Sequence, residues 1–222
     1  MRVLILGLPG SGTSCVADIY QRAGYFGGEP YFSRGVYPYP TCESLLGRAV
    51  NRIILGSEAK DWPSWRWHDD FCPRNPYSDI EVFTLGHWFV NEQDKHGDWF
   101  FKNPESLLNW TAFWSRFEWD EVIGVYRHPE ESIRTLHSTQ KACHRRNVWN
   151  RYSRRMLQAV TRTVRFPDDM DELAANFGVE SPYAPHLRKT QVDYDPAGST
   201  WCRRQWLELE ARRCPSTIVK TI

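Results

Sequence analysis

The chain of 222 residues has no large excess of charge of either sign and no long apolar run. Lysine plus arginine number 28 and aspartate plus glutamate 27, so the composition gives no reason to expect nucleic acid or an anionic membrane as the main partner. No apolar segment approaches the roughly 20 residues of a membrane-spanning helix. The first apolar segment, Val3 to Leu6, ends in glycine-rich sequence and is too short for a signal peptide. We therefore expect a cytoplasmic protein without a membrane span.

Paired cysteines, internal repeats and low-complexity tracts are also lacking. The six cysteines are scattered, with no Cys-x-x-Cys pair and no cysteine and histidine cluster at zinc-finger spacing. We expect reduced thiols and no metal site. The length suits a single domain over residues 1–222, in which the segment from about 190 to 222 forms an extension of uncertain structure. The oligomeric state is left open.

Short apolar runs followed by a polar turn and a helical pattern recur along the chain. They predict strands at residues 3–6, 99–101 and 122–126, with a further short strand at 163–166. Repeated units of strand, turn and helix imply a parallel sheet that is covered on both faces. The predicted fold class is α/β, a three-layer P-loop-like fold with a central parallel sheet of about four or five strands flanked by helices.

Apolar residues at helical spacing predict the helices between these strands. One begins at Thr41 as its N-cap, and its apolar stripe consists of Leu45, Leu46, Ala49, Val50, Ile53 and Ile54. Another covers 78–94, and its apolar face consists of Ile80, Phe83, Leu85, Trp88 and Phe89. The remaining helices are expected at 13–24, about 147–160, 168–177 and about 203–213.

The most informative segment is the glycine loop, residues 7–14, which joins the first strand to the first helix. It has the outline of G-x-x-x-x-G-K-[ST], with Gly7 and Gly12 at the required separation and Ser14 in the hydroxyl position. Thr13 stands where a nucleotide triphosphatase has lysine. Backbone N–H groups at the helix start, with the hydroxyls of Ser11, Thr13 and Ser14, are predicted to bind a phosphate or sulfate.

Three segments resemble the sulfotransferase family, with gaps, over residues 1 to about 190. Residues 9–14, Pro-Gly-Ser-Gly-Thr-Ser, resemble the family's 5′-phosphosulfate loop, whose common forms are Pro-Lys-Ser-Gly-Thr-Thr and His-Arg-Ser-Gly-Thr-Ser. Residues 102–104, Lys-Asn-Pro, resemble the Lys-Asp-Pro turn of bacterial sulfotransferases. Residues 122–136, VIGVYRHPEESIRTL, resemble the strand, Arg-His-Pro turn and helix that hold the nucleotide's 3′-phosphate.

The resemblance implies 3′-phosphoadenosine 5′-phosphosulfate (PAPS) as the donor of a sulfuryl group. The group would pass by in-line displacement to a hydroxyl or amine of a small-molecule, carbohydrate or other acceptor, with no metal required. Arg127 and Thr135 would close on the 3′-phosphate, while Arg188 and Lys189 resemble late basic residues that return over the nucleotide. The implied 5′ site consists of Gly10, Ser11, Gly12, Thr13 and Ser14.

Catalysis needs a cation that the glycine loop does not supply, because Gly10 stands where family members usually have lysine or arginine. Lys102 is the best substitute, since parallel strands deliver their carboxyl ends to one edge of the sheet. We favour Glu43 as the general base, because its surroundings resemble the Gly-aromatic-Glu segment of bacterial sulfotransferases. Cytosolic members use histidine, which leaves His68, His87 and His128 as further candidates.

Two other functions remain open at this level. A P-loop kinase acting on a small molecule would require magnesium and ATP, and the chain lacks both the loop lysine and an obvious aspartate for the metal. The second open function is a nucleotide-binding, sulfotransferase-like module without catalysis, because Gly10 provides no cation in the glycine loop.

Overall fold

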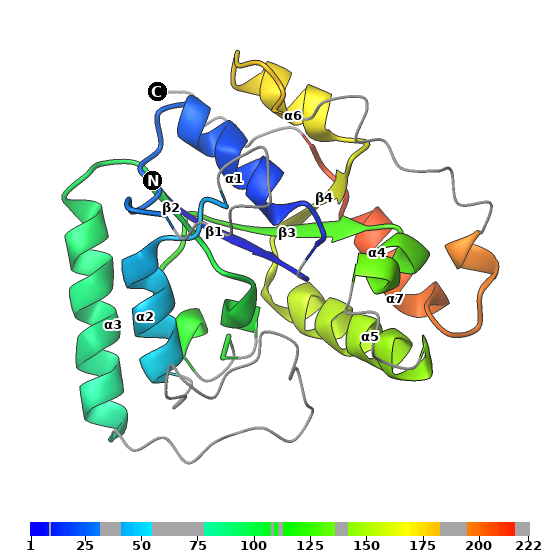
Figure 1. Ribbon diagram of the computed structural model, residues 1–222, viewed down its shortest axis with the longest axis horizontal. Helices are drawn as coiled ribbons and strands as arrows, with labels where there is room; N and C mark the ends of the chain where they lie inside the picture. The colour runs from blue at the N-terminus through cyan, green and yellow to red at the C-terminus, as the bar shows by residue number, and fades with distance from the viewer. Residues whose placement is uncertain are drawn as a thin grey trace.

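A four-stranded parallel sheet forms the centre of the fold (Figure 1). The structure is a computed structural model that describes residues 1–8, 10–31, 41–54, 78–107, 109–110, 113–135, 142–182 and 195–215. Helices flank both faces of the sheet, which confirms the predicted α/β class. The strand order is β2-β1-β3-β4, with β1 at Arg2–Gly7, β2 at Trp99–Lys102, β3 at Glu121–Arg127 and β4 at Arg162–Phe166.

The order of the strands reverses at β1, which has β2 on one side and β3 on the other. Ile5 of β1 is in register with Lys102 of β2, and Gly7 is in register with Val125 of β3. Open parallel sheets bind ligands outside the carboxyl ends of their strands, where the order reverses. Here that place lies between the glycine loop after β1 and the turn after Arg127.

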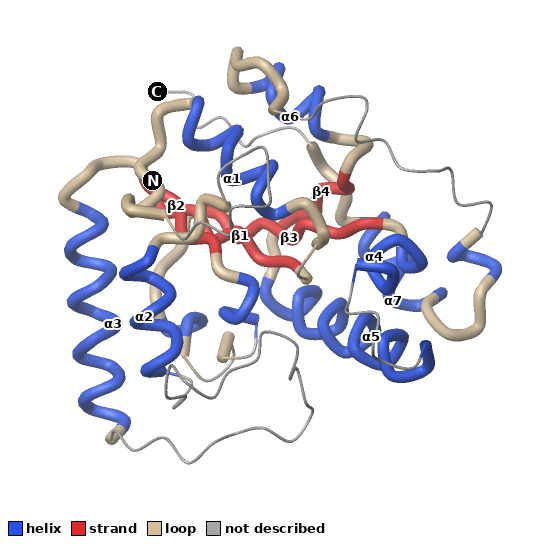
Figure 2. Tube along the Cα trace, viewed as in Figure 1, coloured by secondary structure: helices blue, strands red, loops and turns tan. Residues whose placement is uncertain are grey.

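The helices form a layer on each face of the sheet, and each layer has its own hydrophobic core. Alternation along β1 sends Val3 and Ile5 into one core and Leu4 and Leu6 into the other. As Figures 1 and 2 show, α1 (Thr13–Arg22) and α6 (Met170–Asn176) cover one face, and the other carries α2 (Leu45–Ile54), α3 (Asp79–Asp94) and α5 (Ala142–Ala159).

Shorter elements complete the described chain. Helix α4 (Pro129–Thr135) follows β3 directly, and α7 (Arg203–Ala211) packs against α5. No helix within the described ranges is long and apolar enough to cross a membrane. Single 3₁₀ turns lie at Pro104–Leu107, Trp114–Arg116 and Pro196–Gly198.

The predicted start of the second helix is wrong. Helix α2 begins at Leu45, and the Ser44 hydroxyl caps it by accepting a hydrogen bond of 3.1 Å from the Gly47 N–H. Leu45 and Leu46 are exposed rather than inward, whereas Val50 and Ile54 of the predicted stripe are buried. The helix instead turns Gly47 toward the sheet. The close approach is evident from the fact that a Cβ on Gly47 would lie only 2.6 Å from the Phe101 ring.

Helix α3 has the expected limits, and its predicted inward face is confirmed in part, because Phe89 is buried and Phe83 and Leu85 pack, partly buried, against the same core. Ser78 and Glu81 form a capping box at its start. Ile80 and Trp88 are 79% and 45% exposed. The inward face carries Gly86, where a Cβ would lie 2.2 Å from the Phe113 ring, together with Val82, Phe89, Val90 and Gln93.

The other predicted helices and the fourth strand are confirmed with shifted ends. The first helix ends at Arg22, and Gly24 follows it with a φ of 93°. Helix α5 begins at Ala142, before the predicted start. The ends of α6, α7 and β4 lie within two residues of their predicted positions.

Candidate anion-binding site

The glycine loop turns the chain from β1 into α1 with two glycines in left-handed conformations. Gly10 has a φ of 79° and Gly12 a φ of 98°, and the Ser11 N–H donates a hydrogen bond of 3.0 Å to the Leu8 carbonyl. The first N–H groups of an α-helix have no acceptor within the helix, and the N-cap residue of α1 is Gly12, which has no side chain to bond them. These N–H groups and the positive end of the helix dipole therefore make the loop suitable for an anion.

The side chains of the loop pack closely around Gly7. A Cβ at Gly7 would lie 2.6 Å from both Ser11 Oγ and Thr13 Cγ2, so only glycine fits there. Ser11 and Thr13 are buried, and Ser11 Oγ has no hydrogen-bond partner among the described residues. A buried hydroxyl without a partner costs about 1–3 kcal/mol. The loop thus contains a polar group that an oxygen of a bound anion can satisfy.

Lys102 brings a cation to the first turn of α1. Its Nζ donates hydrogen bonds to Ser14 Oγ at 3.1 Å, to the Thr41 carbonyl at 3.0 Å and to Glu43 Oε1 at 2.7 Å. The Lys102 side chain is only 2% exposed. Three predicted site residues, Ser14, Lys102 and Glu43, therefore meet, although they come from α1, β2 and the segment before α2.

Glu43 lies between two cations. While Oε1 accepts from Lys102, Oε2 accepts a hydrogen bond of 2.8 Å from Arg48 Nη1. The side chains of Glu43 and Arg48 are 14% and 11% exposed, so water screens this pair weakly. Sequence reasoning missed Arg48, whose only signal was its position five residues after Glu43 on the predicted helix.

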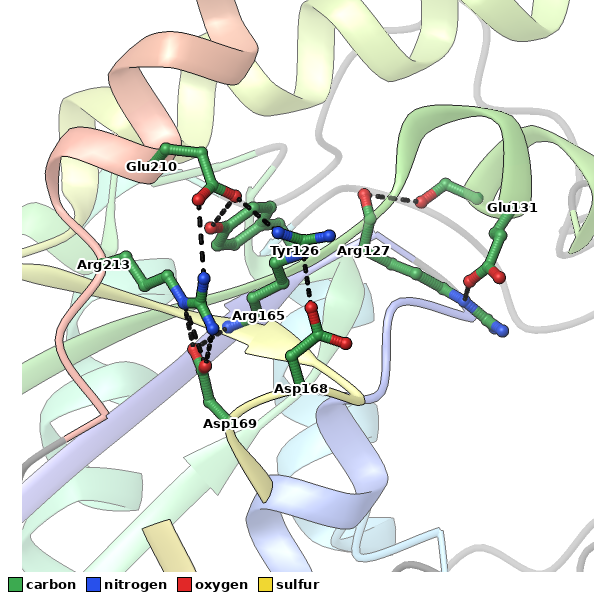
Figure 3. A network of polar contacts seen from close by, with 9 residues as sticks. Tyr126, Arg127, Glu131, Arg165, Asp168, Asp169, Glu210 and Arg213 are labelled. Carbon is green, nitrogen blue, oxygen red and sulfur yellow. Dashed lines mark hydrogen bonds and ion pairs between the residues drawn. The ribbon is translucent and has the colours of Figure 1, made fainter. Parts of the chain in front are cut away.

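Arg127 approaches the loop from the end of β3. Its Nε donates to the Glu131 carboxylate, as Figure 3 shows, and its Nη1 lies 3.5 Å from the Gly10 carbonyl oxygen. Its Cζ lies 5.3 Å from the centre of the Phe166 ring. Nη2 has no hydrogen-bond partner in the part of the chain that the structure describes. Arg127 is therefore buried and oriented, with donor capacity left for a ligand.

Glu131 and Phe166 were not identified from the sequence. Glu131 lies in the first turn of α4, whereas Arg127 ends β3, so this pair joins a strand end to the helix that follows it. Phe166 gave no signal, yet a Cβ on Gly12 would lie 2.3 Å from its ring, so one ring packs against both Gly12 and Arg127. Phe166 thereby ties the start of α1 to the arginine.

The remaining predicted nucleotide ligands are placed only in part. Thr135 is the last residue of α4, the helix that begins two residues after Arg127, and its side chain is outside the described residues. Arg188 and Lys189 also lie outside the described residues. Their predicted roles stay predictions.

The candidate histidines lie in other surroundings. His87 on α3 packs against the rings of Phe83 and Phe117, and His128 packs against Trp206. His68 lies outside the described residues. Glu43 is the candidate base for which the structure gives a contact with Lys102.

A second polar network, also shown in Figure 3, supports the ends of β3 and β4. Glu210 on α7 accepts from the Tyr126 hydroxyl at 2.7 Å, and Asp169 accepts from Arg213 Nε at 2.9 Å. Burial and the bond to Glu210 raise the pKa of Tyr126, and the bond to Asp169 raises the pKa of Arg213. Both groups therefore stay protonated at neutral pH, and their hydrogen bonds hold α7 and the residues after it to β3 and to the turn after β4.

The described chain offers little for cysteine or metal chemistry. Burial raises the pKa of both Cys15 and Cys42 to about 12, so these thiols stay protonated at neutral pH and are poor nucleophiles. The described residues contain no group of three or more histidine, cysteine, aspartate or glutamate side chains that could hold a metal ion.

Comparison of the chain with protein families, curated proteins and solved structures gives no match. The candidate site therefore rests on the residues and on their geometry.

Proposed function

We propose that the protein is a sulfotransferase that uses PAPS as its donor. The observation that carries this proposal is the placement of Lys102 Nζ on Ser14 Oγ, in the first turn of α1. Gly10 leaves the glycine loop without the cation that sulfuryl transfer needs, and the neighbouring strand supplies one at the same helix end. The resemblance of residues 9–14 and 122–136 to sulfotransferase segments gives the donor its identity.

The 5′-phosphosulfate would lie on the N–H groups of the loop, with Lys102 beside the oxygen that joins phosphorus to sulfur. The acceptor oxygen or nitrogen attacks sulfur, and its new bond to sulfur forms as the bond from sulfur to the phosphate oxygen breaks. That oxygen keeps the electron pair, and Lys102 stabilises its charge. Glu43 takes the acceptor's proton. The products are the sulfated acceptor and adenosine 3′,5′-bisphosphate.

Arg127 is suited to the 3′-phosphate of the nucleotide. Its guanidinium is buried beside the Gly10 carbonyl, and Nη2 is available for a ligand oxygen. Hydrogen bonds between a guanidinium and a phosphate are short and strong. The loop and Arg127 together would therefore require a nucleotide with both a 5′ group and a 3′-phosphate.

Thermal unfolding with nucleotides tests this proposal. Adenosine 3′,5′-bisphosphate at millimolar concentration should raise the melting temperature without magnesium, because it binds the folded state. No shift at that concentration would overturn the proposal. A larger shift with ATP and magnesium would favour the kinase.

An arginine variant tests the assignment of the 3′-phosphate. Arg127→Met should weaken binding of adenosine 3′,5′-bisphosphate by roughly 10- to 100-fold, the equivalent of about 1.5–3 kcal/mol for a hydrogen bond to a charged group. Binding of adenosine 5′-phosphate, measured by the same calorimetric titration, should change little. Arg134→Met, on the exposed side of α4, is the matched control. Equal losses for both nucleotides would contradict the assignment.

A further inference from the structure

All three N–H groups of Lys102 are already in use. An ammonium group has three donors, and its three partners are Ser14 Oγ, the Thr41 carbonyl and Glu43 Oε1. The side chain is almost completely buried, and it has no other partner in the described chain. If Lys102 is to contact the donor, as the proposed function requires, one of these three hydrogen bonds has to break.

Glu43 is the partner that the donor would displace. Ser14 Oγ and the Thr41 carbonyl are neutral, whereas Glu43 is an anion that would repel the phosphosulfate at close range. Glu43 also has a second cation, because Arg48 donates to its other oxygen at 2.8 Å. Arg48 can therefore hold the carboxylate in place after Lys102 has turned to the donor.

We propose that Glu43 occupies Lys102 until the donor arrives, and that donor binding releases Glu43 to act as the base. This inference rests on the proposed function and specifies the sequence of events, in which the donor binds first and the proton is removed afterwards. A donor oxygen replaces Glu43 Oε1 on Lys102, and no covalent bond changes in this exchange. The released oxygen then takes the proton of the acceptor. Glu43 thus couples occupation of the donor site to proton removal, and the donor binds before the acceptor can react.

The variant Glu43→Gln separates this role from a structural one. Glutamine has nearly the same shape but no charge, so it competes less for Lys102. The variant should bind adenosine 3′,5′-bisphosphate about tenfold more tightly than the natural chain, a difference of about 1.4 kcal/mol. Its melting temperature without nucleotide should be lower, because the buried ion pairs of Glu43 with Lys102 and Arg48 are lost. A purely structural residue would give weaker binding together with lower stability.

Matched variants identify the source of the gain. Glu92→Gln removes one negative charge from a surface pair with Lys95 and should leave the affinity unchanged. In a Lys102→Met background, Glu43→Gln should bring a smaller gain, because the competition for the ammonium is gone. Glu43→Asp keeps the charge and is the second variant at this position, in case Glu43→Gln does not fold. It should not bind the bisphosphate more tightly than the natural chain.

The results distinguish the exchange from the proposed function. If the natural chain does not bind adenosine 3′,5′-bisphosphate, the proposed function fails. If it binds and Glu43→Gln binds equally well or more weakly, the exchange is wrong while the donor assignment stands. A tenfold gain that persists unchanged without Lys102 would also contradict the exchange, because it would indicate general repulsion.

Discussion

Replacing Gly12 by alanine would test how closely the glycine loop fits against β4. Gly12 has a φ of 98°, a conformation that costs a residue with a Cβ about 1–2 kcal/mol. The added Cβ would also lie 2.3 Å from the Phe166 ring, and overpacking of this kind costs typically about 1–3 kcal/mol. We therefore expect Gly12→Ala to lower the free energy of unfolding by about 2–5 kcal/mol.

A second glycine separates the two contributions. Gly24 has a similar φ of 93°, but a Cβ there would meet nothing within 4 Å. Gly24→Ala should cost only the backbone part, about 1–2 kcal/mol. The difference between the variants then measures the clash between the loop and Phe166.

Urea unfolding followed by circular dichroism gives both values. In a Phe166→Leu background the smaller, more flexible side chain can move aside, so Gly12→Ala should cost closer to what Gly24→Ala costs. The reasoning is refuted if Gly12→Ala is no more destabilising than Gly24→Ala. Strict additivity of the Gly12 and Phe166 substitutions would refute it as well, since residues in contact should couple.

Three further predictions concern the site and its supports. Lys102→Met should weaken binding of adenosine 3′,5′-bisphosphate in calorimetric titration by roughly 10- to 100-fold, and an unchanged affinity would remove its assigned role. Glu121→Gln leaves the buried guanidinium of Arg162 without its carboxylate and should lower the free energy of unfolding in urea by about 3–5 kcal/mol; a loss below about 1 kcal/mol would contradict this pairing. At pH 8 Cys42, whose pKa is raised to about 12, should be alkylated by iodoacetamide far more slowly than exposed Cys214, and peptide mapping that finds equal rates would be inconsistent with its burial.

The sheet and the glycine loop were predictable because their signals are local. Strand β1 is a short apolar run that ends in glycine, and the turn after Arg127 contains proline, so both boundaries are marked in the sequence. Because the strands are parallel, Lys102 at the end of β2 and Arg127 at the end of β3 lie at the same edge of the sheet. The meeting of Lys102 with Ser14 required the register of β1 with β2 as well, and the sequence does not specify that register.

The inward faces of α2 and α3 were mispredicted at some positions, for a common reason, although Val50, Ile54 and Phe89 are buried as predicted. Apolar periodicity counts large side chains, and it therefore placed Leu45 and Ile80 inside. Both helices instead approach their neighbours through glycines, Gly47 against Phe101 and Gly86 against Phe113. Close packing favours a glycine where a large aromatic ring lies against the helix, because a side chain there would collide with the ring. Apolar periodicity does not detect such a position.

A crystal structure with adenosine 3′,5′-bisphosphate would test the central claim most directly. We predict the 5′-phosphate on the free N–H groups at the start of α1, those of residues 12–14, with Lys102 Nζ on one of its oxygens and no longer on Glu43, and the 3′-phosphate on Arg127. A nucleotide bound away from the glycine loop, or one whose 3′-phosphate does not contact Arg127, would contradict the account.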